Sequence, residues 1–153
     1  MKISKKQLIS DLNYLLIRLD KKYSINSGGC CLIAFIIAKL LKKVNIPFSL
    51  KIYSEWYLNE DIISKEISSK IINYEEENSC TGENTCNHYS LLTPFGEINP
   101  DNKSSIIIKN VSYDDIQWIY KNGMWNDGFN LDNSKLIIKI IKLFFYEKAR
   151  RLD

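Results

Sequence analysis

Several residue types are scarce in this sequence, and each scarcity narrows what the chain can be. The 153 residues contain a single histidine, so any chemistry that needs an imidazole falls on His88. The net charge is only +3, from 21 basic and 18 acidic residues, and so small an excess does not by itself indicate nucleic-acid binding. We interpret the lysines, which are spread along the expected helices, as solvated faces, and we expect no nucleic-acid partner.

Long apolar runs are also missing. The run from Cys31 to Ala38 stops at Lys39, well short of the roughly 20 residues that a membrane-spanning helix needs. Residues 1–6 lead into an amphipathic pattern rather than the apolar core of a signal peptide. We therefore expect no membrane association and a cytoplasmic location, where the four cysteines would remain reduced. The abundance of isoleucine, lysine and asparagine suggests an AT-rich genome, and hence a bacterium or a phage-infected host cell.

Nothing in the composition divides the chain. Apolar residues make up 45% and charged residues 25%, values typical of a globular fold, and there is no repeat or Gly/Ser-rich linker. The sequence therefore predicts one domain over residues 1–153. The order of its periodic segments predicts the α+β class, with a small antiparallel sheet packed on one central helix and further helices at its sides.

The apolar periodicity places the individual elements. Helices are expected over residues 4–20, 30–44, 59–73, 112–122 and 131–150, and strands over residues 48–54, 88–93, 97–99 and 105–109. The isoleucine content of residues 59–73 also allows a strand there. Ser4 and Gln7 fit a capping box at the start of the first helix. The last helix is expected to turn six side chains inward: Leu136, Ile137, Ile140, Ile141, Phe144 and Phe145.

Cys30 closes the run Ser27-Gly28-Gly29-Cys30 and begins the most apolar helix of the chain. A thiol there lies among backbone N–H groups that lack an intrahelical acceptor and at the positive end of the helix dipole. Both effects favour the thiolate, which is the nucleophilic form. The two glycines allow a tight turn and leave room for a substrate. Cys31 is the alternative nucleophile if the helix begins one residue later.

His88 and Asn99 lie on consecutive predicted strands. If Pro94 and Phe95 form a two-residue loop, His88 pairs with Asp101 and Asn99 is its diagonal neighbour on the same face. A three-residue loop would turn Asn99 to the other face, so the register decides the geometry. An asparagine beside a histidine can fix its tautomer and orientation. Asp101 is the alternative orienting residue.

These motifs together resemble the papain-like and transglutaminase-like cysteine hydrolases, and more narrowly their small bacterial and phage members. The resemblance covers about residues 24–100. It rests on Ser-Gly-Gly-Cys at 27–30 before a long apolar helix, Asn-His-Tyr at 87–89 and Gly-Glu-Ile-Asn at 96–99. The chain order of cysteine, histidine and asparagine also agrees. The resemblance implies a papain-like fold in which the cysteine begins the central helix and the other two residues come from consecutive strands.

The same resemblance implies roles for these residues. Cys30 would be the nucleophile, His88 the general base and acid, and Asn99 the orienting residue of a Cys-His-Asn triad. The oxyanion hole would combine the Cys30 backbone N–H with a second donor, for which Asn26 and Ser27 are the candidates. The chain departs from the papain-like pattern here, because no glutamine stands upstream where that family keeps its oxyanion donor.

Two further groups have alternative interpretations. Cys80, Cys86 and His88 could bind zinc, but a structural zinc site needs four ligands and the spacing is not that of a CxxC knuckle, so no metal is expected.

Trp125, in the loop 122–130, could form a substrate-binding wall with Gly28 and Gly29 near the thiol. Alternatively, it docks the last helix on the core.

The leading hypothesis is a cysteine hydrolase or acyltransferase that needs no cofactor. It would act on a peptide, isopeptide or other amide bond of a peptide or protein substrate. The second hypothesis is a non-catalytic binding protein with a protein partner, such as a virion component or an inhibitor of host defence, that retains the same scaffold. The third is a small zinc-binding module.

Overall fold

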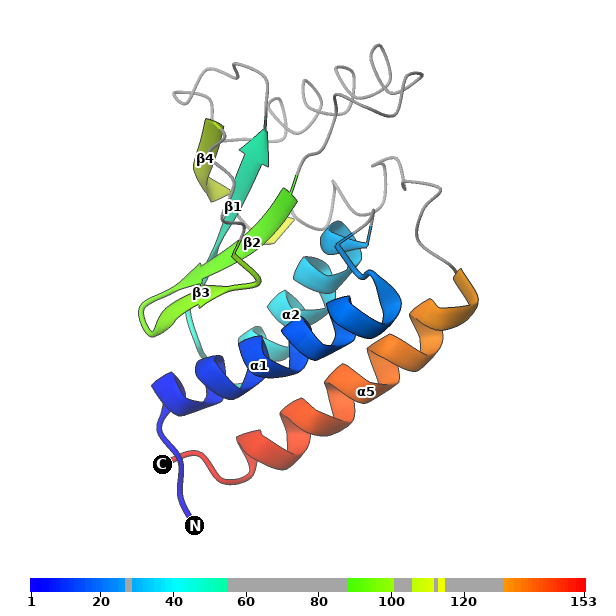
Figure 1. The fold of residues 1–153 in the computed structure, drawn as a ribbon. Coiled ribbons are helices and arrows are strands. Elements are labelled where there is room, and N and C mark those ends of the chain that lie inside the picture. Colours follow the sequence, from blue (N-terminus) through cyan, green and yellow to red (C-terminus); the bar gives the residue numbers. More distant parts are fainter. Residues whose placement is uncertain (27–28, 55–87, 101–105, 112, 115–130) are drawn as a thin grey trace.

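The computed structural model describes residues 1–26, 29–54, 88–100, 106–111, 113–114 and 131–153 (Figure 1). The described helices are α1 (Lys5–Tyr23), α2 (Cys30–Lys43) and α5 (Leu131–Ala149), and the described strands are β1 (Ser49–Ser54), β2 (His88–Thr93), β3 (Gly96–Ile98) and β4 (Ile106–Val111). Figure 1 shows the helices gathered on one side and the sheet on the other. This arrangement confirms the α+β class and the small antiparallel sheet. The expected helix at 59–73 and most of the one at 112–122 lie outside the described residues.

The sheet has the strand order β3-β2-β1-β4, and each neighbouring pair is antiparallel. Thr93 pairs with Gly96, which confirms the two-residue loop at Pro94–Phe95. Side chains alternate along a strand. One face carries fully buried apolar residues of the core, namely Leu50, Leu91 and Ile98. The other face carries a polar group formed by Lys51, Ser90 and Glu97.

Helix α1 begins at a capping residue that the sequence predicted. The Ser4 hydroxyl accepts a hydrogen bond from the Gln7 backbone N–H at 3.1 Å. The second half of the expected capping box differs, because the Gln7 side chain donates instead to Asp11 Oδ1, one turn further along the helix, at 2.6 Å. The buried face of the helix is formed by Leu8, Ile9, Leu12, Leu16 and Leu19.

Helix α2 is the central element, as predicted from its continuous apolar character. Every residue from 32 to 38 is buried, because α2 packs against β2 on one side and α5 on another. The helix ends at Lys43, and Asn45 follows in a left-handed conformation with φ of 53°. A helix surrounded in this way needs an apolar circumference, which the sequence supplies.

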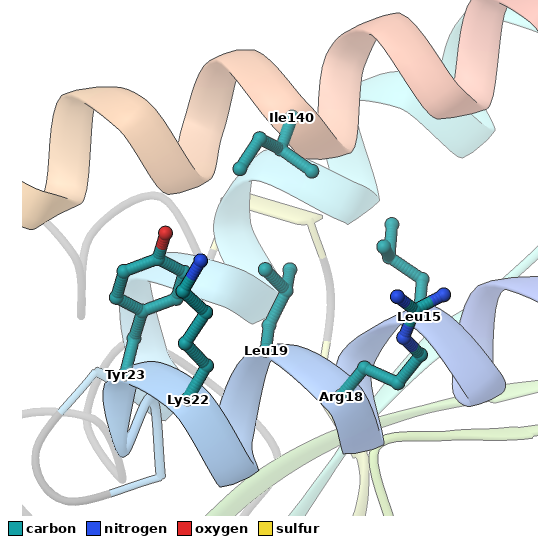
Figure 2. Close-up of a pocket in the computed structure, with 6 residues that line it drawn as sticks. All are labelled: Leu15, Arg18, Leu19, Lys22, Tyr23 and Ile140. Atoms are coloured by element: carbon teal, nitrogen blue, oxygen red, sulfur yellow. The ribbon is translucent and has the colours of Figure 1, made fainter.

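Helix α5 lies across α1 and α2 but buries a narrower stripe than expected. Ile137, Ile141 and Phe145 are fully buried, whereas Ile140 and Phe144 are only half-buried. The prediction for Leu136 is wrong, since its side chain is 45% exposed. The reason is that the contacts of α5 with α1 and α2 involve the side that carries Ile137, Ile141 and Phe145, whereas Leu136 lies on a flank outside that side. Between this flank and α1 lies a small pocket (Figure 2).

The two ends of the chain meet beside α1 and α5. Ile3 and Leu152 form an isolated parallel bridge, in which the Ile3 N–H donates to the Arg151 carbonyl at 2.8 Å and the Asp153 N–H donates to the Ile3 carbonyl at 3.2 Å. Figure 1 shows the N- and C-terminal ends side by side. Within the part of the chain that is described, no helix combines the length and apolar character needed to cross a membrane.

Candidate active site

Cys30 is the first residue of α2, as the glycine pair predicted. Gly29 is the N-cap with φ of −96° and ψ of −4°, and its carbonyl accepts the first helical hydrogen bond, from the Ile33 N–H, at 3.0 Å. The Cys30 side chain is 4% exposed and Cys31 is half-buried. The helix does not begin one residue later, so the condition that would have favoured Cys31 is not met. Cys30 therefore occupies the first turn of α2, where backbone N–H groups lack an intrahelical acceptor.

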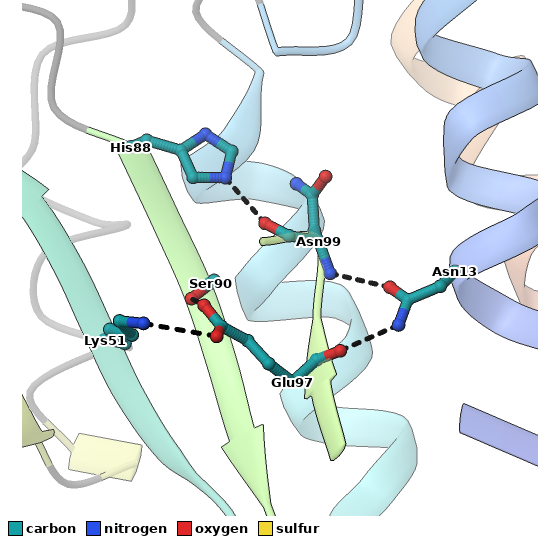
Figure 3. Close-up of polar contacts among 6 residues, drawn as sticks. All are labelled: Asn13, Lys51, His88, Ser90, Glu97 and Asn99. Carbon is teal, nitrogen blue, oxygen red and sulfur yellow. Dashed lines mark hydrogen bonds and ion pairs between the residues drawn. The ribbon is translucent and has the colours of Figure 1, made fainter. Parts of the chain in front are cut away.

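His88 begins β2, at the same end of the molecule as the start of α2 (Figure 1). Its side chain is 7% exposed, and its Nε2 lies 2.6 Å from the backbone carbonyl oxygen of Asn99 (Figure 3). A carbonyl oxygen only accepts hydrogen bonds, so Nε2 must carry the proton and donate. In the neutral ring the basic nitrogen is then Nδ1. The contact with the Asn99 carbonyl thus sets which nitrogen of the neutral ring is basic.

The Asn99 backbone is held in place from two directions. Its φ of 58° is left-handed, a conformation that asparagine adopts more readily than most residues. Its N–H donates to Asn13 Oδ1 on α1 at 2.8 Å, while Asn13 Nδ2 donates to the Glu97 carbonyl at 2.7 Å (Figure 3). One α1 side chain therefore fastens the end of β3 and aims the Asn99 carbonyl at His88.

The side chain of Asn99 makes a different contact from the one that the sequence suggested. Its Nδ2 donates to Asn26 Oδ1 at 2.9 Å, and Asn26 Nδ2 donates to Asn99 Oδ1 at 3.3 Å. Asn99 leaves the strand after Ile98, and its left-handed turn directs the carbonyl, rather than the amide, toward the imidazole. The predicted neighbour of His88 is therefore present, but the contact goes through its backbone.

Asn26 links this arrangement to the loop that precedes Cys30. Its backbone N–H donates to Asp20 Oδ1 at 2.8 Å, which ties the loop to the end of α1. The amide that was considered for the oxyanion hole is engaged with Asn99. The structure thus joins His88, Asn99 and Asn26 in one series of hydrogen bonds. Its last member, Asn26, lies four residues before Cys30 in the sequence.

Asn13 is a site residue that sequence reasoning missed. It lies on the polar edge of an amphipathic helix, where an asparagine is unremarkable, and its partners are on β3, far along the chain. No local motif in the sequence predicts the contact between Asn13 and the end of β3. The sequence shows only that Asn13 is a polar residue at the border between the apolar and solvated faces of α1.

A buried polar group lies next to His88 on the same face of the sheet. Ser90, which is 1% exposed, donates from Oγ to Glu97 Oε1 at 2.7 Å, and Lys51 Nζ lies 3.2 Å from Glu97 Oε2 (Figure 3). These contacts join β1, β2 and β3 through one carboxylate. They fix the strand that carries His88 relative to its two neighbours.

The other residues considered from the sequence lie outside the described residues. They are Ser27, Gly28, Cys80, Cys86, Asp101 and Trp125. Within the described ranges, no three histidine, cysteine or acidic side chains come together in a group that could hold a metal ion. The zinc hypothesis, which depends on Cys80 and Cys86, stays a prediction.

Comparison with known proteins adds no assignment. No family model matches the sequence, and neither a curated protein nor a solved structure matches the chain.

Proposed function

We propose that the chain is a cysteine hydrolase or acyltransferase of papain-like character that acts on a peptide, isopeptide or other amide bond. Cys30 is the nucleophile, His88 the general base and acid, and Asn99 the residue that orients the imidazole. The enzyme would work in a reducing, cytoplasmic compartment, where the thiol stays available. No cofactor takes part in the proposed reaction.

The observation that carries the proposal is the hydrogen bond from His88 Nε2 to the Asn99 carbonyl. It makes Nδ1 the basic nitrogen of the neutral ring, which is the atom that can accept a proton. The asparagine expected to orient the histidine thus serves through its main chain. A buried histidine held in this way supports a role in proton transfer.

The proposed reaction has two steps. First, the Cys30 thiol gives its proton to His88 Nδ1 and its sulfur attacks the substrate carbonyl carbon, after which Nδ1 returns the proton to the leaving nitrogen and the C–N bond breaks. Second, water gives a proton to Nδ1 as its oxygen attacks the thioester, and the sulfur leaves as a thiolate and regains a proton from the imidazolium. An amine in place of water gives acyl transfer.

One oxyanion donor fits the geometry directly. The Cys30 backbone N–H belongs to the first turn of α2, whose N–H groups point out of the helix end. Because the Asn26 amide is paired with Asn99, we assign it the role of holding Asn99 rather than of binding the oxyanion.

Alkylation of the thiols tests this proposal. We expect iodoacetamide to modify Cys30 near neutral pH faster than it modifies a free thiol, because a larger fraction of a thiol at a helix N-terminus is ionised. Modification sites are located by peptide mass spectrometry. Cys30→Ser should abolish the fast reaction and His88→Ala should slow it, whereas the matched variant Cys31→Ser should leave it unchanged. A rate at Cys30 no faster than that of a free thiol contradicts the proposal.

Two observations favour the second candidate, a non-catalytic binding protein on the same scaffold. Cys30 is only 4% exposed. Strand alternation also places His88 on the face of Ser90, whereas Leu91 on the opposite face shares the core with α2. If Cys30 reacts only after denaturation, the binding role replaces the enzymatic one. Metal analysis of the purified protein separately tests the zinc hypothesis.

A further inference from the structure

The pocket between α1 and α5 has an apolar floor and a basic edge. It measures about 280 Å³ and is lined by Leu15, Leu19 and Tyr23 of α1, by Ile140 of α5, and by Arg18 and Lys22. Figure 2 shows the side chains of the two helices turned toward this space. The Lys22 ammonium lies 5.2 Å from the Tyr23 ring centroid, so the cation stays close to the apolar lining. Apolar atoms thus lie beside fixed positive charge.

The apolar surface extends from the pocket along α5. Leu136 and Leu143 lie one turn before and one turn after Ile140, and they are 45% and 62% exposed. Residues at this spacing share one side of a helix. Leu136 and Leu143 therefore extend the apolar row of α5 on either side of Ile140, and we call this row together with the pocket lining the apolar patch.

Cations border this patch on both sides. Arg18 and Lys22 stand on the α1 side, and Lys135, Lys139 and Lys142 each directly precede a residue of the α5 apolar row. These three lysines are exposed. The acidic residues of α1 are engaged elsewhere, since Asp11 pairs with Lys148 and Asp20 accepts from the Asn26 N–H. On the described part of α5, the exposed acid of this flank is Glu147.

We propose that this α1–α5 face docks on an anionic phospholipid bilayer, contrary to the sequence-based expectation of no membrane association. The two helices lie flat, Leu136 and Leu143 enter the boundary between headgroups and acyl chains, and the pocket takes the end of a lipid chain. The flanking cations contact the phosphate and carboxylate groups. The charge of the face complements that of the lipid surface. The phosphates of a nucleic acid could also bind the cations, but they offer no apolar surface to the leucines between those cations. The leucines therefore favour a lipid surface over a nucleic acid.

Co-sedimentation of the full chain with vesicles tests the proposal. We expect binding to vesicles of phosphatidylserine and phosphatidylcholine in equal parts, weaker binding as salt rises, and none to phosphatidylcholine alone. Lys22→Gln should weaken binding about fivefold, as expected for one cation close to the lipid surface. Lys21→Gln removes the same charge one residue away, outside the pocket lining, and should weaken binding less than twofold.

A second pair of variants separates apolar insertion from charge. Leu143→Ser should weaken vesicle binding, whereas Ile17→Ser, at a residue of α1 that is 67% exposed and away from the pocket, should leave binding unchanged. Circular dichroism checks that each variant is folded. Equal effects within either pair overturn the proposal, as does binding to duplex DNA that exceeds binding to the vesicles. Cys30→Ser should bind vesicles normally, since this face is independent of the proposed chemistry.

Discussion

At the scale of single residues, the left-handed backbone of Asn99 determines how His88 is held. The carbonyl reaches the imidazole because φ is positive, and the Asn13 side chain secures the N–H of the same residue. The side-chain amide of Asn99 is occupied by Asn26. Substitutions at position 99 can therefore separate the effect of the backbone conformation on His88 from the effect of the side-chain amide.

We expect Asn99→Gly to keep the His88 contact and Asn99→Ala to weaken it. Both variants lose the amide, but glycine adopts a positive φ freely, whereas alanine costs about 1–2 kcal/mol there. Because His88 is the only histidine, imidazole ¹⁵N NMR reports its tautomer without overlap. The Nε2–H form should dominate in the parent protein and in the glycine variant. Equal loss of this form in both variants would instead assign the orienting role to the side chain.

The sequence identified several of these residues but not how they meet. Cys30, His88 and Asn99 could be named because a glycine pair, a unique histidine and a short hairpin mark them. The carbonyl contact could not be foreseen, because it depends on one φ angle at the end of β3. The contribution of Asn13 depends on packing between α1 and β3, which no local pattern encodes.

At the scale of elements, α1 and α5 are joined by an ion pair as well as by apolar packing. Lys148 Nζ lies 2.8 Å from Asp11 Oδ2, and both side chains are less than one quarter exposed. The hydrogen bond from Lys148 lowers the pKa of the Asp11 carboxyl below its usual value, and Gln7 and Arg151 act in the same direction, while burial opposes them. The ionised carboxylate is thus favoured in the folded chain.

The lowered pKa predicts how the stabilisation by Asp11 depends on pH. Since the folded pKa lies below the unfolded one, the stabilisation is complete above the unfolded value of about 3.9 and is lost as pH falls through the folded value. Asp11→Asn should cost about 0.2–1 kcal/mol at pH 7 in urea unfolding, and the difference from the parent should shrink in acid. Glu147→Gln, an exposed carboxylate of α5, is the control. A difference that stays constant down to pH 2 contradicts the prediction.

Most described elements follow from periodicity, with exceptions that packing explains. The alternation in 48–54 and the buried run of α2 each correspond to an observed element within a residue or two. The inward face of α5 is narrower than its apolar pattern predicts, because the sequence shows which residues are apolar but not which sides of the helix its neighbours cover. The Gln7 side chain likewise bonds to Asp11 rather than completing the capping box. The Asp11 carboxylate and the Ser4 backbone N–H compete for the same Gln7 side-chain amide.

At the scale of the whole molecule, the bridge between Ile3 and Leu152 fastens the start of the chain to its end. We expect Ile3→Pro to lower the free energy of unfolding by about 1–3 kcal/mol, because proline removes the N–H that bonds to the Arg151 carbonyl. Ile3→Val keeps that N–H and should cost about 0.5–1.5 kcal/mol. Urea unfolding measures both, and a proline variant as stable as the valine variant would show that the bridge contributes nothing.

The same bridge gives the fold a nearly circular connectivity (Figure 1). A linker of about five residues, each spanning at most about 3.5 Å, could close the backbone into a ring. Such a ring could be opened at the hairpin tip, where Pro94 is exposed, so that a permuted polypeptide starts with β3 and finishes with β2. The order in which a ribosome makes the helices and strands would then change, while every native contact outside that turn stays the same.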